Sequence, residues 1–393
     1  MLSYARNQFQ IQNQPNFMKR NALLTLITVL LVLCGCRQGN NTSLTFNKDI
    51  YTPQYATGFK ILGAPNKAST MIQVTNPWQG AEKTVLHYLV SRNGEQTPAN
   101  FNGQVIKADA QRIVCMSSSY IAMLDAIGEV KRVIAVSGLD YVSNPYIVAH
   151  KDSIYDVGPQ PDFESLLALR PDVVLLYGIT DSQSALTGKL KELNIPYMFV
   201  GEYLEESPLG KAEWMIALSE LTDTREKAVK LFNRIPLQYE SLKALVDTIG
   251  QKPSVMFNAP WNDSWIMPSS QSYMVKLIND AGADYVYPEQ SSNRSMPIGL
   301  ETAYTLIQQA DYWLHPGSAN TLEELTRMNP KFAHAKSVKQ HTVYNNNLRS
   351  TPFGGNDFWE SATVQPHIVL RDLISIFHPT VISDTLFYYK RLE

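Results

Sequence analysis

Cysteine is scarce in this chain, and that scarcity excludes a disulfide framework. The 393 residues contain only Cys34, Cys36 and Cys115. We expect the first two to lie in a processed N-terminal segment, which leaves Cys115 alone in the mature protein. A single cysteine inside the apolar run 113–116 is typical of a small buried residue rather than a reactive thiol. A large hydrophobic core must therefore hold the fold together without cross-links.

Other absences narrow the function. The formal net charge is only -2, which gives no support for a nucleic-acid partner. Of the seven histidines, His315, His334 and His341 are nearest in sequence, but their spacing matches no standard metal site. We therefore expect no resident metal and no cofactor, with binding of a bare metal ion as a disfavoured alternative. The sequence contains neither a nucleophile elbow nor a glycine-rich phosphate loop, which argues against an enzyme. An exported hydrolase remains the alternative from another functional class.

The N-terminal segment has the pattern of an export signal. Lys19 and Arg20 precede an apolar run at 22–33, which is shorter than the roughly 20 residues of a membrane-spanning helix. Gly35 and Cys36 follow, so we predict a lipoprotein signal peptide at 1–36 with the lipid on Cys36. An uncleaved N-terminal anchor is the alternative, and Met18 is an alternative start of translation.

The remaining chain predicts an α/β fold of two parallel-sheet lobes joined by a long rigid helix, with a small N-terminal β extension. Residues 37–110 show a polar tether and then short strand patterns broken by turns. Apolar strands alternate with helices in 111–222 and again in 250–393, which indicates two lobes with covered parallel sheets. Between them, 223–249 has apolar residues at helical spacing, and Pro236 should bend that helix.

The order of these motifs resembles the periplasmic binding proteins of the iron-siderophore, haem and cobalamin ABC importers. The most specific stretch is 164–174, Glu-Ser-Leu-Leu-Ala-Leu-Arg-Pro-Asp-Val-Val, and the similarity covers roughly 111–380. The resemblance implies a ligand held between the lobes, by loops at the carboxyl ends of the strands, as in other open parallel sheets. It implies no catalysis.

The resemblance also implies which residues contact ligand and permease. Aromatic and basic residues in the strand-end loops are the candidates for ligand binding: Tyr120, Tyr141, Trp261, Trp265, Arg294, Arg349 and Trp359. One exposed glutamate on each lobe is expected to dock with the permease. Glu164 matches the first position, whereas Glu301 fits less closely, because it stands ten residues before Asp311 and Glu164 stands eight before Asp172.

The expected ligand is a ferric siderophore, haem or cobalamin, and the sequence does not choose among them. The expected partners are an ABC permease with its ATPase, and a membrane reached through the N-terminal lipid. The expected location is the periplasm or cell envelope. The adjacent carboxylates Glu205 and Glu206 are interpreted as a solvated surface rather than a catalytic pair.

Overall fold

The computed structural model describes residues 46–178, 183–262, 264–287 and 295–393. The predicted signal peptide, Cys36 and Arg294 lie outside these residues. The described N-terminal part is a five-stranded sheet in which the strands follow the order of the chain. Neighbouring strands are antiparallel except for the last pair, which is parallel. Its strands are β1 (Lys48–Tyr51), β2 (Phe59–Gly63), β3 (Thr70–Thr75), β4 (Val85–Ser91) and β5 (Gln104–Lys107).

The N-terminal lobe is built on a fully parallel sheet with the strand order β10-β9-β6-β7-β8. All four residues of β9 are buried, as expected of a strand covered on both faces. Its strands are β6 (Ile113–Cys115), β7 (Val133–Val136), β8 (Tyr155–Asp156), β9 (Val173–Leu176) and β10 (Tyr197–Phe199). Its helices are α2 (Ser118–Ala126), α3 (Pro145–Ala149), α4 (Phe163–Leu169) and α5 (Gln183–Glu192). Cys115 is buried in β6, in agreement with the sequence.

The C-terminal lobe repeats this plan with the order β14-β11-β16-β17-β18, in which only the last pair is antiparallel. These strands are β11 (Ser254–Phe257), β14 (Asp284–Tyr285), β16 (Tyr312–Leu314), β17 (Val343–Asn345) and β18 (Lys390–Arg391). A small antiparallel sheet of β12 (Pro260–Trp261), β13 (Ser264–Met267) and β15 (Met296–Gly299) adjoins them. The helices are α9 (Tyr273–Asp280), α10 (Leu300–Gln309), α11 (Leu322–Met328), α12 (Lys336–Lys339) and α13 (Pro366–Phe377).

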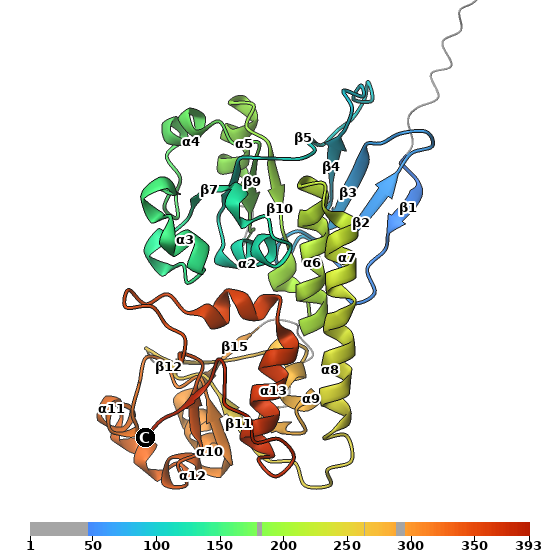
Figure 1. Cartoon of the computed structure of the whole chain (residues 1–393). Coiled ribbons are helices and arrows are strands. Elements are labelled where there is room, and N and C mark those ends of the chain that lie inside the picture. Colours follow the sequence, from blue (N-terminus) through green and yellow to red (C-terminus); the bar gives the residue numbers. More distant parts are fainter. Residues whose placement is uncertain (1–45, 179–182, 263, 288–294) are drawn as a thin grey trace, which may run out of the picture. The chain divides into compact units, whose positions relative to one another are not determined.

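Two consecutive helices run beside both lobes where one long helix was expected (Figure 1). They are α7 (Arg225–Phe232) and α8 (Arg234–Ala244), and Asn233 between them keeps helical dihedral angles. Pro236 has no N–H to donate to the carbonyl of Phe232, which accounts for the interruption at this point. Helix α13 packs against α8 and ties the C-terminal lobe to this connection.

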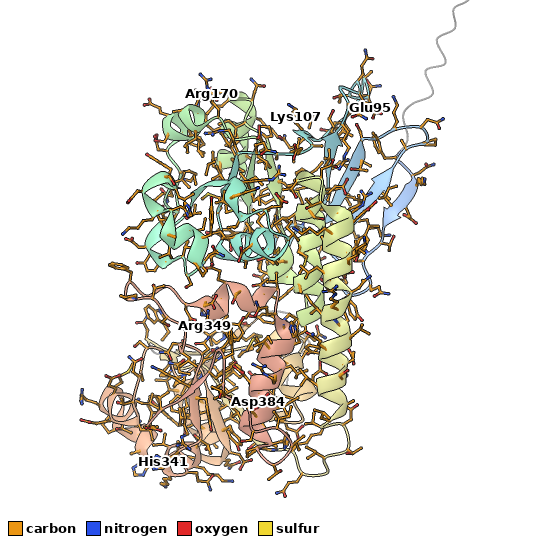
Figure 2. The ribbon with its side chains drawn as sticks, in the orientation of Figure 1. Glu95, Lys107, Arg170, His341, Arg349 and Asp384 are labelled. Carbon is orange, nitrogen blue, oxygen red and sulfur yellow. The ribbon has the colours of Figure 1, made fainter. Side chains whose placement is uncertain are left out.

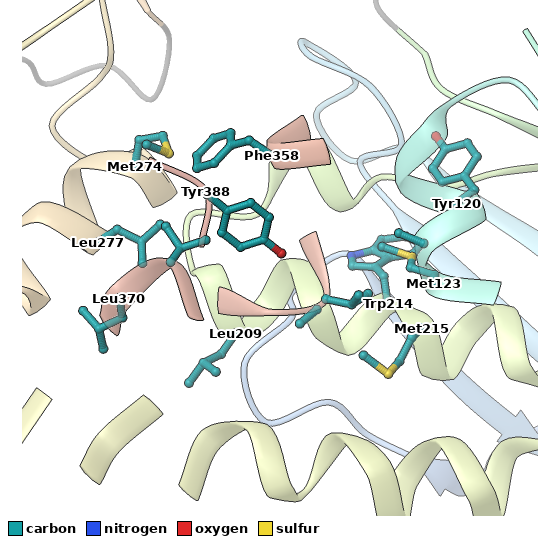
Figure 3. Close-up of a cluster of buried hydrophobic side chains, with 14 of the residues drawn as sticks. Tyr120, Met123, Leu209, Trp214, Met215, Met274, Leu277, Phe358, Leu370 and Tyr388 are labelled. Atoms are coloured by element: carbon teal, nitrogen blue, oxygen red, sulfur yellow. The ribbon is translucent and has the colours of Figure 1, made fainter. Parts of the chain in front are cut away.

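A further helix, α6 (Pro208–Leu221), lies at the centre of the fold and has every residue buried. Figure 3 shows Trp214 and Met215 of α6 near Tyr120 and Met123 of α2. The sequence did not predict α6, because a helix that is buried on all sides has no polar face and no amphipathic period.

Buried carboxylates attach the N-terminal sheet to this central helix. Glu213 of α6 accepts hydrogen bonds from the hydroxyl of Tyr51 (2.6 Å) and from the backbone N–H groups of residues 54–56 (2.8–2.9 Å). Glu205, just before α6, accepts the N–H groups of Thr57 and Gly58. The expectation that Glu205 is solvated was therefore wrong: it is 4% exposed, and only its neighbour Glu206 is on the surface.

Candidate ligand-binding cleft

A pocket of about 290 Å³ lies where the two lobes meet α6. The N-terminal lobe contributes the segments that follow β6 and β10, so strand ends of a parallel sheet open onto it. The C-terminal lobe contributes the start of α9 and the 3₁₀ turn η6 (Asp357–Trp359), part of the segment that runs between the lobes in Figure 1. Its principal lining residues are Ser117, Ser119, Glu202, Tyr203, Lys211, Tyr273 and Trp359.

Local sequence explains how the serines reach this pocket. Ser117 is the N-cap of α2, and its hydroxyl accepts the N–H of Ser119, which is the capping function expected of this serine run. The Ser119 hydroxyl donates a hydrogen bond to Oε1 of Glu202 at 2.7 Å. The turn η4 (Glu202–Leu204), which follows β10, is thereby tied to the start of α2.

Glu202 and Lys211 are two buried ionisable side chains on the α6 side of the pocket. Burial raises the pKa of Glu202 and lowers that of Lys211, while the attraction between the two groups opposes both shifts. The Lys211 ammonium donates to the backbone carbonyl of Glu202 at 3.3 Å and lies 4.6 Å from the centroid of the Tyr273 ring. The two residues therefore bring a carboxyl and an amino group to a pocket whose other walls are mostly apolar and include four aromatic rings.

The two lobes also touch at a second, smaller pocket of about 180 Å³. The Glu360 carboxylate accepts the backbone N–H of Ser143 across the lobes at 2.8 Å, and burial raises the pKa of Glu360 to about 7. Gly355 lies against the backbone of Tyr141, where a Cβ would come within 2.5 Å of the Tyr141 carbonyl oxygen. The segment before α13 therefore closes this side of the cleft.

Of the predicted ligand contacts, Trp359 is the one that lines the larger pocket, with 52% of its side chain exposed. Tyr141 and Trp261 are more exposed, at 65% and 76%, and do not line either pocket. Arg349, which is labelled in Figure 2, lines the smaller pocket. Its guanidinium is 2.6 Å from Asp357 and 4.3 Å from the Phe387 ring centroid. Its charge is thus already paired within the protein.

Tyr120 and Trp265 lie in the core instead of the cleft. Both are fully buried; the Tyr120 hydroxyl is 3.2 Å from the carbonyls of Leu176 and Val200, and the Trp265 indole donates to the Phe257 carbonyl at 2.7 Å. A buried ring with a satisfied polar atom is a packing element, and neither residue lines the two interlobe pockets.

The sequence reasoning missed Glu202, Lys211 and Tyr273. Glu202 comes three residues after β10 ends, so the strand-end rule used for the other loops would have found it. Lys211 had no such signal, because it is inside a helix that was not predicted.

The expected docking glutamates are exposed on separate lobes. Glu164 is in the first turn of α4, and Glu301 is in the first turn of α10. A carboxylate is favoured at each position by the helix dipole, so a purely local role would also account for them.

Within the described ranges, no helix is long and apolar enough to cross a membrane. The same residues contain no group of three or more histidine, cysteine, aspartate or glutamate side chains that would hold a metal ion.

Comparison with known proteins identifies relatives over most of the chain. An uncharacterized lipoprotein of Methanocaldococcus jannaschii is 27% identical over 305 residues, which is 74% of this chain and 70% of that protein. Among solved structures, a periplasmic binding protein of Veillonella parvula has a TM-score of 0.58 at 16% identity, covering 79% of this chain and 99% of its own.

Two further solved structures carry ligand names. A periplasmic haem-binding protein of Pseudomonas aeruginosa has a TM-score of 0.56 at 16% identity, covering 72% of this chain and 98% of its own. A periplasmic vitamin B12-binding protein of Vibrio cholerae has a TM-score of 0.51 at 12% identity, with 70% and 99% covered. These likenesses confirm the predicted fold of two α/β lobes. The family described as "Periplasmic binding protein" matches residues 113–346, more than half of the sequence, so the chain belongs to that family of binding proteins, which are not enzymes.

Proposed function

We propose that the chain is the substrate-binding lipoprotein of an ABC importer and that it carries an iron-siderophore-type chelate in the interlobe cleft. The observation that carries this proposal is the pocket between the lobes, which combines the half-exposed Trp359 with the buried Glu202–Lys211 pair. Apolar walls with a few fixed polar groups are typical of small-molecule sites. Haem and cobalamin are the alternatives within the same family, and two proteins of the same fold are described as binding them.

The size of the pocket bears on how such a ligand would be held. Small-molecule pockets are typically about 300–1,000 Å³. At about 290 Å³ this pocket admits only part of a metal chelate. The rest of the chelate would lie between the lobes, against rings such as Trp359, Tyr141 and Trp261.

Export and anchoring complete the proposal. We infer cleavage before Cys36 and lipid attachment to it, which the lipoprotein description of the archaeal relative supports. The proposed division of the chain is a signal peptide at 1–36, a tether and β extension at 37–110, lobes at 111–222 and 250–393, and a linking helical segment at 223–249 that contains α7 and α8. Glu164 and Glu301 are proposed to dock with the permease, where two separated charges orient the encounter without demanding high affinity.

Ligand titration tests the proposal directly. The chain from residue 37 onward would be titrated with ferric siderophores, haem and cobalamin, and binding would be followed by calorimetry and by tryptophan fluorescence. We expect one of these ligands to bind with a one-to-one stoichiometry. If none of them binds and no ligand copurifies with the protein, the proposed function is wrong.

A further inference from the structure

Four buried glutamates lie along η4 and α6, and one of them differs from the others. Both carboxylate oxygens of Glu205, Glu213 and Glu220 accept hydrogen bonds from neighbouring protein groups. Glu202 is equally buried, at 4% exposed, but its Oε2 atom has no hydrogen-bond partner among the described residues. Glu202 is also the member of this set that lines the interlobe pocket. Three of these carboxylates are therefore structural, whereas the fourth has an unused acceptor at the cleft.

The groups around Glu202 leave its acceptor open. Ser119 donates to Oε1, and the Lys211 ammonium donates to the Glu202 backbone carbonyl rather than to the carboxylate. The backbone N–H groups of residues 202 and 203 are close enough to the carboxylate to lower its pKa, but neither meets hydrogen-bond geometry to Oε2. A buried acceptor without a partner is costly, so a ligand that supplies a donor gains more here than at a solvated site.

The charged side chains that line the cleft also favour a ligand that carries no carboxylate. The side chains lining the two interlobe pockets include four carboxyl groups, those of Asp125, Glu202, Asp357 and Glu360. They include two basic groups, Lys211 and Arg349, and Arg349 is already paired with Asp357. Glu360 is partly protonated near neutral pH, but Asp125 and the other carboxyl groups still leave an excess of negative charge along the cleft, which disfavours an anionic ligand relative to a neutral or cationic one.

We propose that Glu202 is a specificity residue that accepts a hydrogen bond from an amide N–H, hydroxyl or ammonium group of the ligand and discriminates against ligands that present a carboxylate there. This inference rests on the proposed function and narrows the ligand to a neutral or cationic metal chelate. The charge of Lys211 favours the ionised form of Glu202 against the effect of burial, and Lys211 supplies a donor beside it, so a primary amide would use both groups.

Ligands that differ only at one end group provide the test. Ferrioxamine B has a terminal ammonium, its N-acetyl derivative an amide, and its N-succinyl derivative a carboxylate, all on the same ferric trihydroxamate. Cyanocobalamin and a monocarboxylate made by hydrolysing one of its amides form a second matched set, and haem supplies a carboxylate-bearing comparison. Affinities of the full chain in detergent would be measured by calorimetry.

The same titrations would be made on Glu202→Gln and on Glu206→Gln, an exposed control with the same chemical change four residues further along. We expect the amine or amide form to bind at least about tenfold more tightly than its carboxylate form, the scale of one hydrogen bond to a charged group. Glu202→Gln should reduce that ratio severalfold, and Glu206→Gln should leave it unchanged. Thermal melts would show whether each variant is folded, and the ratio in the wild-type chain tests the proposal without any variant.

This inference would be overturned if a carboxylate form bound more tightly than its amine or amide form, or if haem bound more tightly than every ferrioxamine and cobalamin tested. Either result would leave the proposed function intact. An unchanged ratio in folded Glu202→Gln would also overturn it. If no chelate binds, the proposed function fails and this inference fails with it.

Discussion

Replacing Glu213 by alanine should release the N-terminal sheet from the central helix. The Glu213 side chain is fully buried and accepts four hydrogen bonds from residues 51–56. Each hydrogen bond to a charged group contributes about 1.5–3 kcal/mol, but bonds that share one carboxylate are not additive. Glu213→Ala leaves the N–H groups of residues 54–56 without an acceptor, and a buried donor without a partner costs about 1–3 kcal/mol, so we expect the free energy of unfolding to fall by about 3–5 kcal/mol.

Urea unfolding followed by circular dichroism would measure this loss, with the exposed Glu206→Ala as the matched control. Hydrogen exchange would locate it, because residues 46–110 should exchange faster while the strands of the C-terminal lobe keep their protection. If Glu213→Ala costs less than about 1 kcal/mol, or if protection is lost equally in all parts of the chain, the sheet is not held by this carboxylate.

Three further predictions concern the cleft and the docking surface. Glu164→Ala and Glu301→Ala should leave ligand affinity unchanged and lower ligand uptake by cells, so normal uptake in both variants would remove the docking proposal. Trp359→Phe should reduce the ligand-induced quenching of tryptophan fluorescence more than Trp261→Phe does, because Trp359 lines the pocket; the opposite order would show that the ligand binds elsewhere. The pKa of Glu360 is raised from 4.5 to about 7, so the folded state keeps this proton at higher pH than the unfolded state and the unfolding free energy falls as pH rises between those values. In Glu360→Gln the decrease of the unfolding free energy with pH should be smaller than in wild type, by at most about 3 kcal/mol. Identical pH profiles of the urea midpoints in the two proteins would refute the raised pKa of Glu360.

The parts of the fold that depend on local pattern could be predicted from the sequence. Asp162 accepts the N–H groups of Glu164 and Ser165 at the start of α4, and an aspartate directly before a helical pattern is itself a sequence signal for such an N-cap. The short apolar strands were found for the same reason, because β-branched runs between turn residues identify them without any tertiary information.

Burial that depends on distant partners was not predictable in this way. The carboxylate of Glu205 is buried because the backbone of Thr57 and Gly58 folds onto it from nearly 150 residues away. Tyr120 and Trp265 have the residue type of a ligand contact, but their polar atoms are satisfied by carbonyl groups of the core. Residue type alone does not distinguish an aromatic ring facing a cleft from one that packs between a sheet and a helix.

The contact between Gly355 and Tyr141 has a consequence for how wide the cleft can be. A β-carbon at position 355 would lie 2.5 Å from the Tyr141 carbonyl oxygen. Any residue other than glycine would therefore clash with the N-terminal lobe at this point. The close approach of the lobes at this contact therefore depends on the absence of a β-carbon at position 355. Replacing Gly355 by alanine would move the two lobes apart at this contact without altering any charged or aromatic group of the pocket.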